Sequence, residues 1–192
     1  MTPVARAPID RILSNRTRVW QLGVVACGAL AMAISSWISV PMYPVPMTLQ
    51  SFAVCLLAGL AGPVLTVQIV GLWLLAAVLG LPVLADGASG LSTLTGPTGG
   101  YLAGFILAGG LCGWLIQRRD GRKLRALMSS FLLAHLIILT FGFFWLSLKI
   151  GPQDAFSGGV APFLWGAGLK SILATACVKL VLARLTPERP IR

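Results

Sequence analysis

Few residues of the chain could do chemistry, and the two most informative ones lie inside long apolar stretches. Lys170 follows the sequence PFLWGAGL, and His135, the one histidine of the chain, lies in the middle of another apolar stretch. All five acidic residues lie outside these stretches: Asp10, Asp86, Asp120, Asp154 and Glu188. The sequence has no carboxylate dyad, no nucleophile beside a base, and no glycine-rich loop that ends in Lys-Ser or Lys-Thr. It therefore predicts neither an enzyme nor an ATPase, and no catalytic residue.

Lys170 is expected to contact a ligand. If its helix begins near Pro162, a favoured first-turn residue, Lys170 lies about 12 Å from the outer end of that helix. A lysine that faces lipid at such a depth costs about 2.5 to 3.5 kcal/mol, so its side chain should point into the protein. Its partner is then either a ligand anion or a backbone carbonyl group, and we favour the ligand. Gly166, Ala167 and Gly168 leave room for a flat ligand or for close helix packing.

His135 and the cysteines are expected to have structural roles. A lone histidine inside a membrane more often makes a hydrogen bond between helices than it acts as a catalyst. The four cysteines lie singly in the apolar stretches, without the paired spacing of a metal site: Cys27, Cys55, Cys112 and Cys177. We interpret them as small packing residues. No metal and no cofactor are therefore predicted.

The elements that position these residues are expected to be membrane helices. Of the 192 residues, 57% are hydrophobic and 10% are charged, and the mean hydropathy is +0.89. This composition is too apolar for a soluble domain, and recurring apolar runs of about 20 residues indicate helices rather than a barrel. Six spans are predicted, at 19–38, 48–61, 63–80, 98–117, 124–148 and 160–184. The fold class is therefore an all-α integral membrane protein, a single compact six-helix domain over residues 1–192, with a basic tail at 1–18 and a tail at 185–192.

The basic residues predict the orientation of these helices. Twelve of the 15 Lys and Arg residues lie near the two termini or in the loops after the second and fourth spans: Arg6, Arg11, Arg16, Arg18, Arg118, Arg119, Arg122, Lys123, Arg125, Arg184, Arg189 and Arg192. By the positive-inside rule, both termini are predicted to face the cytoplasm. This orientation signal also accounts for the net charge of +10, so nucleic-acid binding is not predicted. The first apolar run lacks a small-residue cleavage signature, and a cleaved signal peptide is not expected.

The first outer connection, residues 39–47, is rich in proline. Its central residues are predicted to form a lid over a site: Tyr43, Pro44, Val45 and Pro46. Each proline favours an extended conformation in the residue before it, so the loop should be stiff and lose little entropy on closing. Thr48 is predicted to cap the next helix, with Gln50 in its first turn. Gln50 then either faces the site or completes the capping.

The segment GPTGGY, residues 96–101, opens the fourth predicted span. Thr98 is expected to be its N-cap. Gly99 and Gly100 would leave N–H groups of the first turn open to a polar group of a ligand, although an ordinary helix cap would look the same.

The first span carries two stripes of small residues. Ala29 and Ala33 form one stripe, and Gly23, Cys27 and Ala31 form the other. Such stripes let another helix approach closely, either within the same protein or from a partner, and internal packing is the safer interpretation.

Four motifs of the chain together resemble the BioY family. They are PVPMTLQ before the second span, GLPVLADGASG after the third, GPTGGY at the fourth and PFLWGAGLK in the sixth. Members of this family are the biotin-binding S components of energy-coupling factor (ECF) transporters. Each motif alone is weak, but the four in this order and spacing cover all six spans and make the resemblance specific.

The resemblance implies a multi-pass protein of the bacterial inner (plasma) membrane that captures biotin from outside. The implied partners are biotin, membrane lipid, a transmembrane coupling protein that docks near Ala29 and Ala33, and two ATPases that supply the energy. The implied substrate contacts lie in the outer loops and later helices: Lys170, Gln50, Thr48, Asp86, Gly87, Ser89, Gly90, Gly96, Thr98, Gly99, Tyr101 and Trp165. A mode without dedicated partner proteins stays open.

The chain departs from the family's pattern at one position. Many members have an acidic residue three positions before the lysine, where this chain has Ala167. Without this acidic partner, either Lys170 binds a carboxylate of the ligand, or the ureido group of biotin is recognised in a different way. The alternative functions are an S component for another vitamin, a membrane enzyme that uses His135 or Asp86, and an assembly subunit without a ligand.

Overall fold

The computed structural model describes residues 7–9, 17–119 and 123–185 of the chain. Several predicted features lie outside these residues. They are most of the basic N-terminal tail, the C-terminal tail beyond Leu185, and Arg122 in the basic loop after the fourth predicted span.

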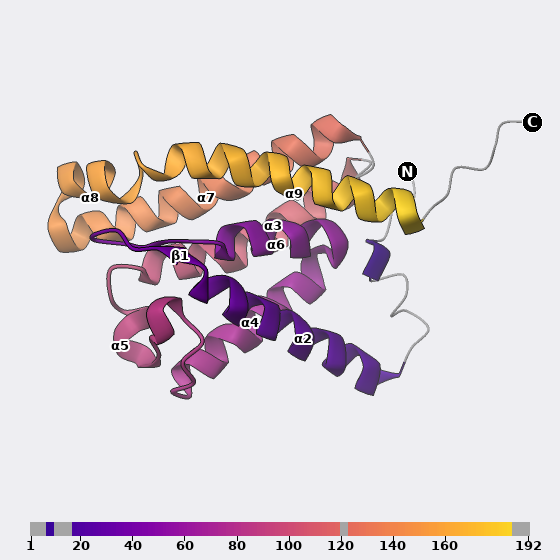
Figure 1. The fold of residues 1–192 in the computed structure, drawn as a ribbon, viewed down its shortest axis with the longest axis horizontal. Helices are drawn as coiled ribbons and strands as arrows, with labels where there is room; N and C mark the ends of the chain where they lie inside the picture. Colours follow the sequence, from indigo (N-terminus) through magenta and orange to yellow (C-terminus); the bar gives the residue numbers. More distant parts are fainter. Residues whose placement is uncertain (1–6, 10–16, 120–122, 186–192) are drawn as a thin grey trace, which may run out of the picture.

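Helices make up most of the described chain (Figure 1). In chain order the elements are α2 (Arg18–Trp37), β1 (Ser39–Val40), β2 (Met47–Thr48), α3 (Gln50–Leu60), α4 (Gly62–Val78), the 3₁₀ helix η1 (Ala85–Gly87), α5 (Gly90–Leu94), α6 (Gly99–Arg118), α7 (Leu124–Ile150), α8 (Pro152–Gly159) and α9 (Phe163–Leu185). The longer helices occupy the ranges predicted from apolar periodicity to within a few residues. The sequence did not predict the short elements, which lie in segments expected to be loops.

Four of the helices are long and apolar enough to cross a membrane, namely α2, α6, α7 and α9. The other two apolar helices are shorter, since α3 has 11 residues and α4 has 17. A helix rises about 1.5 Å per residue, so α3 alone reaches only about half of the 30 Å thickness of a hydrocarbon core. Membrane crossing by α3 and α4, and the cytoplasmic location of the termini, stay predictions.

The boundary between α3 and α4 depends on two adjacent residues. Gly62 has a φ of +79°, a left-handed conformation that glycine adopts at little cost. Pro63 follows in the first turn of α4 and lacks the N–H that a continuous helix would need there. The chain therefore turns between the two helices instead of forming one long span.

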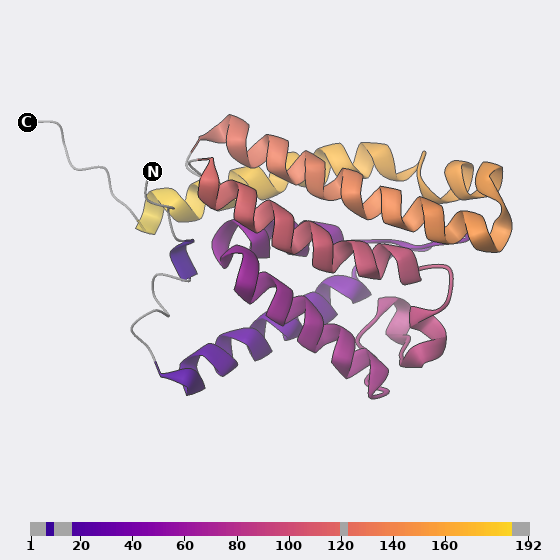
Figure 2. The same ribbon diagram turned by 180° about the vertical axis from the view of Figure 1, so that it is seen from behind.

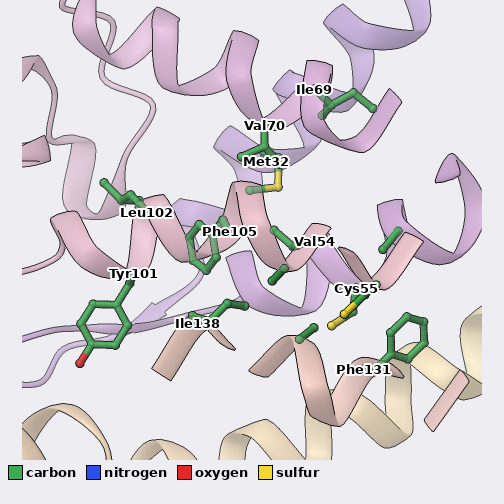
Figure 3. Packing of buried hydrophobic residues seen from close by; sticks show 14 of the residues in the cluster. Met32, Val54, Cys55, Ile69, Val70, Tyr101, Leu102, Phe105, Phe131 and Ile138 are labelled. Carbon is green, nitrogen blue, oxygen red and sulfur yellow. The ribbon is translucent and has the colours of Figure 1, made fainter. Parts of the chain in front are cut away.

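The helix α6 lies at the centre of the packing. It packs most extensively against α7, and also against α4 and α3, while α9 packs against α7 and α3 and α2 packs against α4 and α3. In Figures 1 and 2, α7 and α9 run along one edge of the protein, and α2 and α4 lie toward the other. Figure 3 shows the side chains that fill the space between these helices, including Met32, Val54, Phe105 and Phe131, each at most 4% exposed.

The short elements gather at one end of the bundle. The strands β1 and β2 form an antiparallel hairpin in which Ser39 is opposite Thr48 and Val40 is opposite Met47. This hairpin, α5 and α8 lie at one end in Figure 1, and the beginning of α2 and the end of α9 lie at the other. The three connections that the sequence predicted to be on the outer side are therefore close together.

Candidate functional site

A cavity of about 440 Å³ opens among the short elements at this end. Its lining comes from the hairpin loop, the first turn of α3, the segment from η1 to α5, the beginning of α6, the middle of α7 and the first turns of α9. Cavities that bind small molecules usually measure about 300 to 1,000 Å³ and are mostly apolar with a few polar groups. The cavity is thus of a suitable size and composition to enclose one small ligand.

Lys170 provides the cationic group of the cavity. Its Nζ donates hydrogen bonds to the backbone oxygen of Thr48 at 2.6 Å and to Oγ of Ser51 at 3.3 Å. Both of these partners among the described residues are neutral acceptors, and an ammonium group has three protons, so a third proton is left for a ligand. Both alternatives raised by the sequence are therefore compatible with its position, because the lysine holds a backbone carbonyl and also lines the cavity.

Gln50 is buried beside this lysine and joins three segments. Oγ1 of Thr48 donates to Oε1 of Gln50 at 2.8 Å, and Nε2 of Gln50 donates to Oγ of Ser36 in α2 at 2.6 Å. The predicted capping of α3 by Thr48 is wrong, because α3 begins at Gln50 after Leu49 and has no side-chain cap. Thr48 instead belongs to β2, and its hydroxyl group fixes the orientation of the Gln50 amide.

Another part of the cavity lining is apolar and aromatic. Tyr101, Leu102 and Phe105 contribute from α6, and Phe163 contributes from α9. The rings of Tyr101 and Phe163 lie 6.2 Å apart between centroids, and the Tyr101 hydroxyl donates to the backbone oxygen of Gly159 at 2.7 Å. Figure 3 shows Tyr101, Leu102 and Phe105 along α6, with Ile138 of α7 beside them. This wall therefore offers ring surface to a ligand, while the hydroxyl group is already used.

His135 lies in the middle of α7, 4% exposed, and also lines the cavity. Its Nδ1 is 2.9 Å from the backbone oxygen of Phe131 and 3.0 Å from Oγ of Ser171 in α9. The predicted contact between helices is thus confirmed. The other ring nitrogen, Nε2, is buried and has no partner among the described residues.

Asp86 reaches the cavity from the segment between α4 and α6. It has a φ of +56°, and its Oδ1 accepts a hydrogen bond from Oγ of Ser39 at 3.2 Å. The glycine-rich residues that were predicted with it, Gly87, Ser89 and Gly90, do not line the cavity. Neighbouring residues of the same segment line it instead, namely Leu84, Ala85, Ala88, Ser92 and Thr93.

The start of α6 corrects another prediction. Thr98 is at the N-cap position and lines the cavity, but it makes no capping hydrogen bond, and its Oγ1 is 3.5 Å from the backbone oxygen of Thr93. The N–H of Gly99 donates to the oxygen of Gly96 at 3.2 Å, so it is not open to a ligand. Side chains at Gly99 and Gly100 would collide with the Leu94 oxygen and with Trp145 of α7. These two glycines therefore allow close packing rather than ligand approach.

Other predicted residues lie outside the cavity. Trp165 is 88% exposed and Tyr43 is 90% exposed. Of the three small residues before Lys170, only Ala167 lines the cavity, whereas Gly166 packs against Met47 of the hairpin and Gly168 faces open space.

The structure nevertheless gathers most of the predicted residues around one volume. Those that line the cavity are Pro44, Val45, Pro46, Thr48, Gln50, Asp86, Gly96, Thr98, Tyr101 and Lys170. The sequence favours a structural role for His135 and does not predict several other lining residues, namely Ser51, Pro97, Leu102, Phe105, Ile138, Leu139 and Phe163. Helical spacing relates several of these to predicted ones, since Leu102 lies four residues after Thr98 and Phe105 lies three residues after Leu102. That spacing was the available signal.

The described residues contain no cluster of three or more potential metal ligands. Cys55 and Cys112 are buried, and Sγ of Cys112 donates to the backbone oxygen of Ser130 at 3.0 Å. This position agrees with the packing role predicted for them, whereas Cys27 is exposed.

Comparison with known proteins relates the chain to one family. Residues 10–187 match the model of the BioY family. The chain is 33% identical over 163 residues to the biotin transporter BioY2 of Lactococcus lactis subsp. cremoris, a match that covers 84% of this chain and 89% of the relative. It is 36% identical over 159 residues to the biotin transporter BioY of Thermotoga maritima, with coverages of 82% and 92%.

A solved structure is also similar. It is the S-component for biotin from an ECF-type ABC transporter, with a TM-score of 0.79 and 26% sequence identity. The match covers 88% of this chain and 93% of that one, so nearly the whole described fold is shared.

Proposed function

The chain belongs to the BioY family, and from that premise we propose that it is the biotin-binding S component of an ECF-type transporter. It takes up biotin and catalyses no reaction of its own. The observation that carries this proposal is the cavity at the loop end of the bundle, which a lysine ammonium group and several aromatic rings line together.

The cavity lining offers partners for several chemical groups of biotin. Biotin has a ureido group with two N–H donors and a carbonyl oxygen, an apolar thioether ring, and an aliphatic chain that ends in a carboxylate. The free proton of Lys170 suits the carbonyl oxygen or the carboxylate, and a charged donor makes the stronger hydrogen bonds of a site. The rings of Tyr101, Phe105 and Phe163 suit the apolar body. Further contacts are proposed for Thr48, Gln50, Asp86, Gly96 and Thr98.

The hairpin loop is proposed to act as the lid of this site. Within this loop, Val45 is only 4% exposed, and Pro44 lies against α8, where a side chain at Gly158 would collide with the proline ring. The base of the hairpin is held by the hydrogen bond from Lys170 to Thr48. A lid fixed at its base and packed at its tip needs only a small movement to admit a ligand.

Direct binding tests this function. The purified chain in detergent is titrated with biotin in a calorimeter, followed by competition with thiamine and riboflavin. We expect saturable binding of biotin that neither competitor reduces. Absence of biotin binding would contradict the proposal, and displacement by another vitamin would point to a different S component. Biotinamide, which lacks the carboxylate, is titrated as well. Weaker binding than that of biotin would indicate that Lys170 contacts the carboxylate, and equal binding would indicate the carbonyl oxygen of the ureido group.

The finer membrane arrangement is also a proposal. All six apolar helices cross the inner membrane of a bacterium, with both termini in the cytoplasm. Four of them have spanning length, and most basic residues lie near the two termini or in the loops after the second and fourth predicted spans. A fluorescent protein fused to the C-terminus should fluoresce, whereas alkaline phosphatase fused there should be inactive. The reverse result would invert the topology.

We further propose that uptake uses a transmembrane coupling protein and two ATPases. Ala33 is 8% exposed and Ala29 is half-buried against the core, so this stripe leaves little surface for docking. The second stripe on the same helix, Gly23, Cys27 and Ala31, is exposed and is the better docking surface. Replacement of Ala31 by Trp should then reduce co-purification of the coupling protein without reducing biotin binding.

A further inference from the structure

His135 is a cavity residue with an unused polar atom. Among the described residues, only two buried side-chain nitrogen or oxygen atoms have no hydrogen-bond partner, Oγ of Ser130 and Nε2 of His135. Of these two residues, only His135 lines the cavity. Buried polar atoms are almost always hydrogen-bonded, and an unmade bond costs about 1 to 3 kcal/mol. His135 therefore lines a ligand-sized cavity with a ring whose buried Nε2 lacks a partner, and a bound ligand is a source of that partner.

The neighbours of Nδ1 determine what Nε2 can do. The backbone oxygen of Phe131, 2.9 Å away, can only accept a hydrogen bond, so the ring hydrogen is on Nδ1. Oγ of Ser171 is 3.0 Å from the same nitrogen, and its own hydrogen is donated to the oxygen of Ala167 at 2.8 Å. Ser171 therefore also accepts from Nδ1. In the neutral ring, Nε2 then carries a lone pair and is an acceptor.

We propose that Nε2 of His135 accepts a hydrogen bond from a ureido N–H of the ligand. This inference rests on the proposed function and names a specificity-determining residue within it. The lining combines two complementary groups, a lone pair on His135 and a proton donor on Lys170. An N–H beside a C=O, as in a urea, presents the matching donor and acceptor.

The arrangement also holds the ring in place. The contacts of Nδ1 come from three helices, since Phe131 is in α7, Ser171 is in α9, and Cys55, whose Sγ is 3.9 Å away, is in α3. The ring therefore cannot turn its lone pair away without losing these contacts. A site built to accept a hydrogen bond strongly rejects an analogue that lacks the donor, because the buried acceptor then stays unpaired.

The test is a cycle of variants and ligands in the full-length purified protein. His135→Asn keeps a side-chain amide where Nδ1–H lies but has no atom at Nε2, and it is compared with the wild type. Each protein is titrated with biotin and with the two isomers of biotin that carry a methyl group on one ureido nitrogen. Desthiobiotin, which retains the ureido group, serves as the matched control ligand.

We expect His135→Asn to bind biotin and desthiobiotin about tenfold more weakly than the wild type. For one methylated isomer, the loss of affinity relative to biotin should be about tenfold larger in the wild type than in the variant, because only the wild type has this hydrogen bond to lose. A purely structural role would weaken all ligands alike and leave this ratio unchanged. Equal penalties in both proteins for both isomers would overturn the assignment of His135 while leaving biotin binding intact. A wild type that does not bind biotin would overturn the proposed function as well.

Discussion

The two walls of the cavity are built in different ways. The polar wall joins segments far apart in the chain, since Lys170 of α9 holds Thr48 of the hairpin and Gln50 of α3 holds Ser36 of α2. The apolar wall comes largely from successive turns of single helices, such as Tyr101, Leu102 and Phe105 in α6. The polar wall therefore exists only when the whole bundle is assembled, while the apolar wall is a property of α6 and its neighbours. We expect substitutions in the two walls to have different effects on binding.

The largest effect is expected in the polar wall. Lys170→Met removes the charged donor and also the contact to Thr48, so biotin affinity should fall about a hundredfold. Lys179→Met is the matched control, because Lys179 is exposed on the same helix outside the cavity lining and its loss should leave affinity unchanged. Calorimetry measures both. Equal affinities of the two variants would show that the polar wall does not contribute.

A smaller effect is expected from the apolar wall. Phe105→Ala removes ring surface from the cavity, and biotin affinity should fall about tenfold. Phe105 is 4% exposed, so the free energy of unfolding should also fall, by about 3 to 5 kcal/mol. Phe105→Leu keeps most of the volume and controls for folding. A loss of affinity with alanine as large as that of Lys170→Met would remove the distinction between the walls.

Tyr101→Phe separates the ring from the hydroxyl group within the apolar wall. The hydroxyl donates to Gly159, so its loss should cost about 1 kcal/mol of unfolding free energy. Because the ring still lines the cavity, biotin affinity should change by less than about threefold. A larger fall in affinity would mean that the hydroxyl group meets the ligand, and Tyr101 would then belong with the polar wall.

The smallest effect is expected at Trp165, where the family motif and the structure differ. The motif includes this residue among the substrate contacts, but it is 88% exposed and outside the cavity. Trp165→Ala should therefore change biotin affinity by less than about twofold, a shift of about 0.4 kcal/mol. A tenfold loss would place this side chain over the site in the ligand-bound protein.

The same contrast explains what the sequence could predict. A lysine is conspicuous inside an apolar helix, so burial alone predicts that Lys170 contacts a ligand, and the family resemblance adds Thr48 and Gln50. Phe105, Ile138 and Phe163 were not found, because every face of a membrane helix is apolar and composition does not distinguish a cavity wall from the lipid side. The helices themselves were predictable, since their apolar runs are long.

Local hydrogen bonds and close contacts are harder to predict from the sequence than the helices. Thr48 was expected to cap α3, but the hairpin places it in β2, and pairing between strands is decided by partners that a linear pattern does not reveal. The sequence leaves Gly99 and Gly100 open between ligand contact and an ordinary helix cap, whereas the positions of the Leu94 oxygen and Trp145 show that they allow close packing. His135 was correctly expected to join two helices, yet the free nitrogen on its other side depends on where the cavity lies.

The hairpin base has a consequence for how the length of this loop can vary among related proteins. Thr48 uses its backbone oxygen for Lys170 and its hydroxyl group for Gln50, and Leu49 donates its N–H to the oxygen of Ile38. Insertion of one residue between Met47 and Gln50 would shift all three contacts at once and turn alternate side chains to the other face. At the tip, Pro41 and Tyr43 are exposed, so insertions and deletions there leave the base intact. Relatives should therefore differ in the length of the tip and agree in the spacing from β2 to α3.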